Sequence, residues 1–166
     1  MLDNVNCFVL IKKFIKIVIS VLFALPVIVY VIIVIANNSI ANNIEKELKS
    51  IELPNNTEIV DSISVAGKIS GNGNGMQYFG AILVSSELNE DELENYYQNY
   101  SKDIHVAKQE TPNIFDGSYY QGYKFDDFDS NKKNYMVHRW KYNDSSWNYE
   151  DNNFISELLN YDLRGH

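Results

Sequence analysis

A run of twenty residues without a charge, from Ile17 to Ala36, constrains this chain more than any other feature. A helix of that length rises ~30 Å, which is the thickness of the hydrocarbon core of a bilayer. The run has no polar stripe at helical spacing, whereas a soluble core helix would have one. We therefore expect a transmembrane helix, because backbone groups in lipid must bond within the helix, and membrane helices tolerate a proline such as Pro26.

Basic residues flank this run unevenly. Lys12, Lys13 and Lys16 lie just before it, and the first basic residues after it are Lys46 and Lys49. Positive charges close to a span favour the cytoplasmic side. The sequence thus predicts a single-pass protein of the cell membrane, with a cytoplasmic N-terminus and a C-terminal domain outside.

The expected layout has four parts. Residues 1–16 form a cytoplasmic tail, 17–36 the transmembrane helix, 37–56 a juxtamembrane helix and linker, and 57–166 an extracytoplasmic domain. A cleaved signal peptide is the alternative to a permanent anchor.

Ser39-Ile40-Ala41 resembles a signal-peptide cleavage site, so residues 1–41 would be removed in that case. The apolar run is longer than the ~7–15 residues of a signal peptide, which favours the anchor. Cys7 is the only cysteine and precedes the run, which excludes a lipoprotein signal. The outer domain therefore holds no disulfide and must be stabilised by its core.

The charge balance excludes some classes of partner. The chain has 14 Lys and Arg against 22 Asp and Glu, a net charge of −8, and three of its lysines precede the span. An acidic outer domain argues against binding to nucleic acid and against docking on anionic lipid headgroups, because both need basic surface. The many Asn and Ile residues are typical of AT-rich bacterial genomes and indicate a bacterial cell envelope.

A second apolar pattern follows the span. Ile40, Ile44, Leu48 and Ile51 recur at helical spacing, and the helix is expected to end by Leu53, before a proline. We interpret this stripe as packing against the chain's own domain. The alternative is the seam of a homodimer, although the stripe is shorter than two heptads.

The rest of the chain predicts an α+β fold. Asn89 with Glu92 forms a capping-box pattern at the start of a helix that continues to about residue 100, and residues 154–163 carry a second helical stripe. A glycine-rich hairpin at 71–75 joins the first two strands. The expected strands are 57–69, 76–85, 104–109, 118–125 and 134–142, with a short edge strand at 147–150. We therefore predict an antiparallel sheet of four to six strands, covered on one face by two helices.

Strand alternation gives further detail for two of these strands. In 76–85 both faces are apolar, which predicts a central strand. In 57–69 it places Ile59 on the same face as Ile63 and Val65. The strands 118–125 and 134–142 are expected to pair with each other across a polar turn.

Residues 52–97 combine a Leu-Pro-x-x-Thr entry, the glycine-rich hairpin, an apolar strand and a Glu-Leu-x-x-Tyr-Tyr helix. This stretch resembles a module found behind N-terminal anchors in uncharacterised bacterial extracytoplasmic proteins and lipoproteins. The resemblance covers under a third of the chain. It implies a fold neighbourhood and no activity.

Motifs for chemistry are sparse. Asp127, Asp129 and Asn131 begin like a calcium loop, but Lys132 and His138 stand where the pattern needs Gly and Glu. Asp and Asn also favour turns for purely local reasons. No nucleophile elbow, zinc-protease, phosphate-loop or dinucleotide motif occurs, so no cofactor is expected.

The sequence favours a membrane-tethered binding module over an enzyme. Aromatic residues crowd the expected hairpin 118–142, and only one sheet face can be covered by two helices, so some rings should be exposed to a partner. The predicted partner-binding residues are Tyr119, Tyr120, Tyr123, Trp140, Tyr142 and Trp147, and the partner is an envelope protein or glycan. Two alternatives stay open: the rings form the core of the sheet, or the protein is a small envelope hydrolase that uses Asp or Glu with His105 or His138.

Overall fold

The computed structural model describes residues 2–69, 75–115, 122–143 and 158–165. In chain order the elements are α1 (Leu2–Ser50), β1 (Thr57–Gly67), β2 (Met76–Ser86), α2 (Glu90–Gln98), β3 (Ile104–Gln109), β4 (Asn134–Asn143) and the short 3₁₀ helix η1 (Leu163–Gly165). The four strands form one antiparallel sheet, which confirms the predicted α+β fold. The expected edge strand at 147–150 lies outside the described residues.

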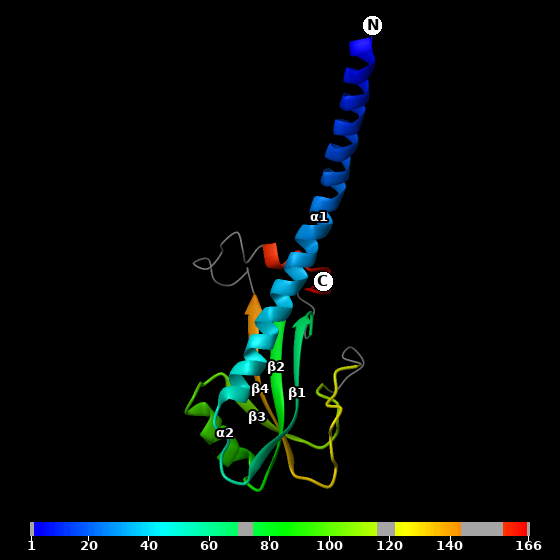
Figure 1. Cartoon of the computed structure of the whole chain (residues 1–166). Helices are drawn as coiled ribbons and strands as arrows, with labels where there is room; N and C mark the ends of the chain where they lie inside the picture. The colour runs from blue at the N-terminus through cyan, green and yellow to red at the C-terminus, as the bar shows by residue number, and fades with distance from the viewer. Residues whose placement is uncertain (1, 70–74, 116–121, 144–157, 166) are drawn as a thin grey trace.

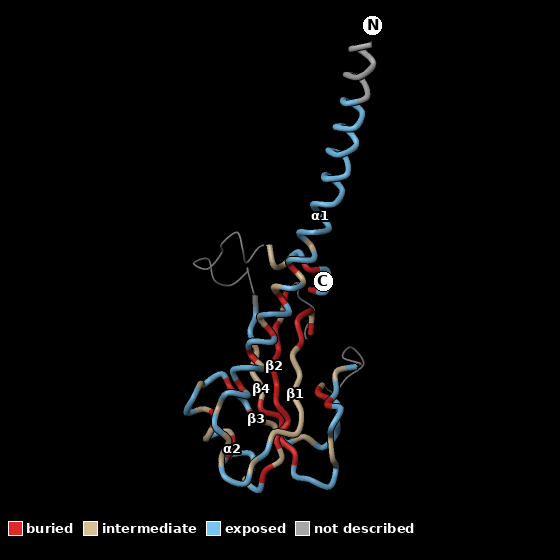
Figure 2. Tube along the Cα trace, in the orientation of Figure 1, coloured by how far each residue is buried: buried red, intermediate tan, exposed pale blue. Residues whose placement is uncertain are grey.

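The expected transmembrane and juxtamembrane helices form one continuous helix, α1. Its 49 residues include Pro26 and rise ~70 Å. Residues 10–29 are exposed along their whole circumference, and the helix extends far beyond the rest of the molecule (Figures 1 and 2). By length and composition α1 fits a membrane anchor. We call the C-terminal part of α1 from residue 37 together with the sheet and its connections, residues 37–69, 75–115, 122–143 and 158–165, the folded body.

The strand order is β1-β2-β4-β3. β2 pairs along its length with β1 on one side and with β4 on the other. This confirms the prediction that β2 is a central strand, since both of its faces are apolar.

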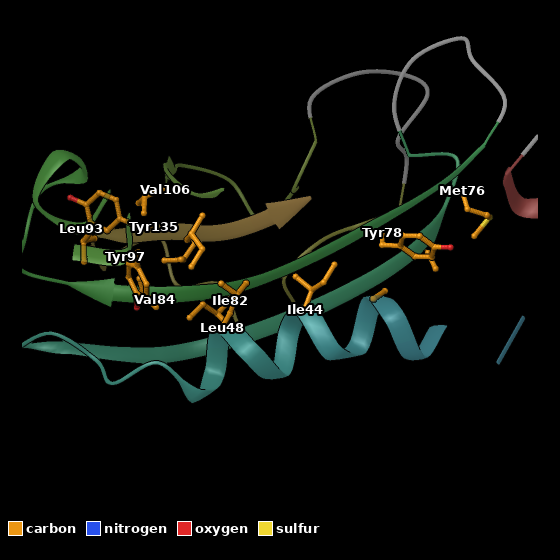
Figure 3. Packing of buried hydrophobic residues seen from close by; sticks show 14 residues of the cluster. Ile44, Leu48, Met76, Tyr78, Ile82, Val84, Leu93, Tyr97, Val106 and Tyr135 are labelled. Carbon is orange, nitrogen blue, oxygen red and sulfur yellow. The ribbon is translucent and has the colours of Figure 1, made fainter. Parts of the chain in front are cut away.

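The first face of the sheet is covered by the C-terminal half of α1 and by α2, which together enclose one hydrophobic cluster (Figure 3). From α1 come Ile44 and Leu48, which are buried, and Ile40, which is partly buried at the edge; Ile51, just after the end of α1, is also partly buried there. The predicted packing of this stripe on the chain's own sheet is confirmed. A seam between two copies through the same residues would require that packing to open.

A glycine allows α1 to approach the sheet closely. A Cβ atom on Gly80 of β2 would lie 2.7 Å from Cγ2 of Ile44 and 2.8 Å from the backbone nitrogen of Glu45. The helix backbone therefore lies almost against β2 at this point, and no larger residue fits without moving α1.

α2 begins as predicted. The side chain of Asn89 accepts a hydrogen bond from the backbone N–H of Glu92, and the Glu92 carboxylate accepts one from the backbone N–H of Asn89. Leu93 and Tyr97 of α2 are fully buried against the sheet. The helix was expected to continue to about residue 100, but α2 ends at Gln98, and Tyr100 beyond it is exposed.

The second face of the sheet is covered by residues 111–115 and 122–128. Ile114 and Phe125 are buried there, and Phe115, Tyr123 and Phe128 are partly buried beside them. Oδ2 of Asp61 on β1 accepts hydrogen bonds from the backbone N–H groups of Asp126 at 2.7 Å and Asp127 at 3.2 Å, and so holds this segment over the sheet.

The predicted pairing of 118–125 with 134–142 is wrong. β4 pairs with β2 and β3, whereas Lys124 makes one isolated bridge to Asn113. The reason is that residues 122–128 are used to cover the second face.

The predicted face of Ile59 is also wrong. A bulge between Ile59 and Asp61 shifts the register of β1 by one residue. Ile59 therefore packs with the cluster under α1, while Ile63 and Val65 point to the second face.

The chain ends beside α1 rather than on a sheet face. Of the predicted helix 154–163, the structure describes residues from 158 onward, and these lie against α1 where it leaves the folded body (Figure 1). Leu163, expected in a buried stripe, is 72% exposed, because the neighbouring Asp162 takes the inward position and is fully buried.

Candidate functional site

Aromatic side chains form a row on the second face of the sheet, at the C-terminal end of β4. His138, Trp140 and Tyr142 alternate along the strand and point to the same side as Phe79 of β2. The Trp140 ring lies 4.7 Å from Phe79 and 6.0 Å from Tyr142 between centroids, and the planes of Trp140 and Tyr142 differ by only 8°.

Exposure increases steadily along this row. Phe79 is fully buried, Trp140 is half-buried, and Tyr142 is 57% exposed. Phe115 contacts Phe79, Trp140 and Tyr123, with centroid distances of 5.1, 5.6 and 6.2 Å. The row therefore begins in the core and ends at the surface. We call Tyr123, Trp140 and Tyr142 the aromatic face.

The backbone that carries the aromatic face is held firmly on one side. Trp140 pairs with Phe79 and Tyr142 with Gln77, both in β2. On the other side, β3 pairs with β4 only as far as Arg139. Within the part of the chain that the structure describes, β4 beyond Arg139 therefore has one free edge next to its most exposed ring.

A groove of about 400 Å³ lies on the opposite side of β4, between this strand and α1. It is lined by Ile40, Asn43, Ile44, Glu47, Asp103, Arg139, Trp140 and Lys141. Arg139 donates to Glu47 at 2.8 Å and to Asp103 at 2.7 Å. Hydrogen bonds from the Ser101 hydroxyl and from Arg139 lower the pKa of the Asp103 carboxyl. Arg139 is paired with both carboxylates, so the groove offers no unpaired arginine to an anionic ligand.

The two histidines of the hydrolase alternative are neighbours across β3 and β4. Their rings lie 5.9 Å apart, and Nδ1 of His138 lies 3.1 Å from the backbone oxygen of His105. Burial lowers the pKa of His138, so this ring favours its neutral form. Nδ1 of His105 lies 3.5 Å from Glu94 of α2, and both side chains are substantially exposed. Neither histidine lines the groove.

The acidic turn is organised by local hydrogen bonds. Oδ1 of Asp129 accepts from the backbone N–H and from the side-chain amide of Asn131, and these bonds lower the pKa of Asp129. Asp127 is exposed, and its backbone N–H is bound by Asp61. Among the described residues no group of three or more His, Cys, Asp or Glu side chains is placed to hold a metal ion.

The predicted partner-binding residues have different outcomes. The structure brings Trp140 and Tyr142 into contact and links Tyr123 to Trp140 through Phe115. Tyr119, Tyr120 and Trp147 lie outside the described residues. Of the described aromatic residues of the predicted surface, Phe125 and Tyr135 are buried core residues instead.

Sequence reasoning missed a polar cluster, buried except for its arginine, where the apolar run of α1 meets the folded body. We call Asn37, Tyr78, Asp162 and Arg164 the junction cluster. The Tyr78 hydroxyl donates to Oδ1 of Asn37 at 2.7 Å, and the Asn37 amide donates to Oδ2 of Asp162 at 3.0 Å. The Arg164 guanidinium donates to Oδ2 of Asp162 at 2.6 Å and holds the pKa of that carboxyl at about 2. Burial raises the pKa of Tyr78 to about 12.

One sequence signal could have revealed this cluster. Asn37 directly follows the apolar run and continues the buried stripe of α1, four residues before Ala41 and seven before Ile44. A polar residue at a core-facing helical position needs a hydrogen-bonding partner.

Comparison with protein-family models, with curated proteins and with solved structures gives no match for this chain. The resemblance of residues 52–97 to bacterial anchored proteins therefore stays a prediction.

Proposed function

We propose that this protein is a membrane-tethered binding module of the bacterial cell envelope, without catalytic activity. In this proposal α1 crosses the cell membrane, and the folded body lies outside and binds an envelope protein or glycan. The apolar composition of α1 and the lysines that precede its apolar run support this arrangement.

The observation that carries the binding role is the stacked pair of Trp140 and Tyr142. Trp140 is fixed by contacts with Phe79 and Phe115, and it presents Tyr142 with more than half of its surface exposed. Tyr and Trp offer large contact area at low cost in conformational entropy, and binding energy concentrates on such residues. A rigid aromatic pair that ends at the surface is therefore suited to hold a partner.

The hydrolase alternative has less support. A hydrolytic site needs a cleft in which a histidine meets carboxylates. In the described parts of the chain His105 meets Glu94 at the surface, and the 400 Å³ groove is lined by other residues.

The proposal is tested by photo-cross-linking of the full-length protein in intact cells. A photoreactive amino acid replaces Tyr142 in one variant. In a control it replaces Tyr100, which is 53% exposed and lies in the connection between α2 and β3. We expect a discrete adduct from position 142 and none from position 100. Treatment of the adduct with protease or with glycan-degrading enzymes then identifies its class.

A second variant pair separates binding from folding. Trp140→Ala combined with the photoreactive residue at 142 should abolish the adduct, while Tyr100→Ala combined with the same residue should leave it. Identical adducts from positions 142 and 100, or an adduct that survives Trp140→Ala in a protein that still unfolds cooperatively, would rule out the aromatic face as the binding surface.

A further inference from the structure

Two large side chains near the end of the chain are exposed where the folded body meets α1. Tyr161 is 70% exposed and Leu163 is 72% exposed. Asp162 between them is fully buried, so the alternation points both apolar side chains outward. The side chains of Tyr161 and Leu163 therefore form an apolar surface that no other described part of the folded body covers.

The position of this segment is fixed from the side of α1. The Asn37 amide donates to the backbone oxygen of Leu159 at 3.1 Å and to Asp162 at 3.0 Å. The Arg164 guanidinium donates to the side chain of Asn38 at 2.8 Å. The first two residues after the apolar run therefore hold the segment.

The same segment is fixed from the side of the sheet. Backbone N–H groups of Lys68 and Gly75 donate to the backbone oxygens of Arg164 at 2.6 Å and Gly165 at 2.9 Å. The segment thus lies between α1 and the connected ends of β1 and β2, at the end of the folded body from which the apolar helix leaves (Figure 1).

The burial of α1 residues shows how far along the apolar run the folded body reaches. Residues 10–29 of α1 are exposed, but Tyr30 is half-buried and Ile33 is only 4% exposed. Protein therefore covers one side of the last two turns of the run, which rise ~10 Å. The headgroup region of a bilayer occupies roughly 5–8 Å on each side of the hydrocarbon core. Asn37 and Asn38, which hold the segment, directly follow the run. If residues 17–36 span the hydrocarbon core, the segment that carries Tyr161 and Leu163 therefore lies at its outer boundary, where the headgroups begin.

We propose that residues 158–165 form a membrane-interface collar, in which Tyr161 and Leu163 insert into the headgroup region of the phospholipid bilayer that α1 crosses. This inference rests on the membrane tethering in the proposed function. Tyrosine is favoured at this depth because its ring is apolar and its hydroxyl is polar. The Arg164 side chain is 38% exposed while it pairs with Asp162, so its guanidinium has surface left to face a lipid phosphate.

The collar has a consequence for binding. A single helix allows the folded body to tilt and rotate above the membrane. The collar adds a second contact with the bilayer, beside α1, and this contact restricts the tilt of the folded body. The aromatic face would then be presented at a defined angle to the membrane surface.

The test uses the full-length protein in phosphatidylcholine nanodiscs. Cys7→Ser removes the native thiol, and single cysteines then replace Tyr161, Leu163, Ile28 or Tyr100, each labelled with an environment-sensitive fluorophore. Ile28 is 55% exposed within the apolar run and reports on the span, and Tyr100 reports on the folded body. Nitroxide lipids carry the quencher either on the choline headgroup or deep in the acyl chain.

We expect labels at 161 and 163 to be quenched by the headgroup nitroxide roughly twofold or more above the label at 100, because interfacial side chains lie within reach of that group. The label at 28 should respond mainly to the acyl-chain nitroxide. All four labelled sites are exposed, and each labelled protein should keep the cooperative unfolding transition of the parent.

Three other outcomes would contradict the collar, the membrane span or both. Quenching at 28 without quenching at 161 and 163 excludes the collar and leaves the anchor in place. An unquenched label at 28 excludes the membrane span and the collar together. Equal headgroup quenching at 100, 161 and 163 shows that the whole folded body lies on the bilayer, which also contradicts a local collar.

Discussion

The side-chain amide of Asn37 donates a 3.0 Å hydrogen bond to Oδ2 of Asp162, and so joins two residues that are 125 positions apart in the chain. Both residues are fully buried. The bond connects the point where the apolar run ends to the last turn of the chain, and it makes α1 part of the folded body rather than a flexible tether.

The junction cluster predicts a contrast between two buried tyrosines. Tyr78→Phe removes the hydroxyl that donates to Asn37, so it should destabilise the folded body by about 1–2 kcal/mol. The Tyr97 hydroxyl is buried without a hydrogen-bond partner among the described residues, so Tyr97→Phe should be neutral or stabilising by up to about 1 kcal/mol. Chemical unfolding of both variants in detergent micelles measures the difference. Equal losses would contradict the assigned role of Tyr78.

The stability of the folded body should fall at acid pH because of Asp162. Arg164 lowers the pKa of this carboxyl from 3.8 to about 2 in the folded chain. A lowered acid pKa stabilises the folded state above the pKa of the unfolded chain, and this contribution disappears as the pH falls from about 4 to about 2. The loss should amount to roughly 2 kcal/mol.

Asp162→Asn is the control for that titration. Its unfolding free energy should be lower at neutral pH and should change less between about pH 5 and about pH 2 than that of the parent. A variant with the same pH dependence as the parent would show that other carboxyls cause the acid sensitivity.

The close approach of α1 to β2 predicts that replacing Gly80 destabilises the folded body. In Gly80→Ala the new methyl group meets Ile44 and the backbone of Glu45, and the expected destabilisation is about 2–3 kcal/mol. Gly67→Ala is a matched control, because its methyl group would lie 3.4 Å from the nearest atom, an ordinary contact. Thermal unfolding of both proteins compares them. Equal transition temperatures would mean that α1 does not sit on β2 as described.

Asp61 should control the order of the segment that covers the second sheet face. Asp61→Ala removes the acceptor of the Asp126 and Asp127 amides, so these two amides should exchange with solvent deuterium faster than in the parent. Asp61→Asn keeps a side-chain oxygen and should retain most of the protection. Unchanged exchange in Asp61→Ala would argue against this contact.

Local patterns predicted most of the fold because they depend on neighbouring residues alone. The alternation at 76–85, the capping box at Asn89 and the stripe through Ile44 and Leu48 each gave the element and the buried face that the structure has. The choice of strand partners depends on the whole sheet, and the pairing of 118–125 with 134–142 was wrong for that reason. A single bulge reversed the face of Ile59, because the side-chain period of a strand is two.

The candidate site was predictable only in part. The many aromatic residues of β4 indicated Trp140 and Tyr142. Which aromatic rings are buried depends on how the segment with Ile114 and Phe125 packs on the second face, and the sequence does not show that packing. The junction cluster was missed because Asn37 and Asp162 are far apart in sequence and carry no motif.

The membrane crossing of α1 is the central claim, and cysteine accessibility tests it most directly. Tyr100→Cys adds an exposed thiol on the folded body, and the native Cys7 lies on the other side of the apolar run. A membrane-impermeant maleimide applied to intact cells should label the introduced thiol at position 100 and should label Cys7 only after lysis. Labelling of Cys7 alone in intact cells, or of both thiols before lysis, would contradict the account.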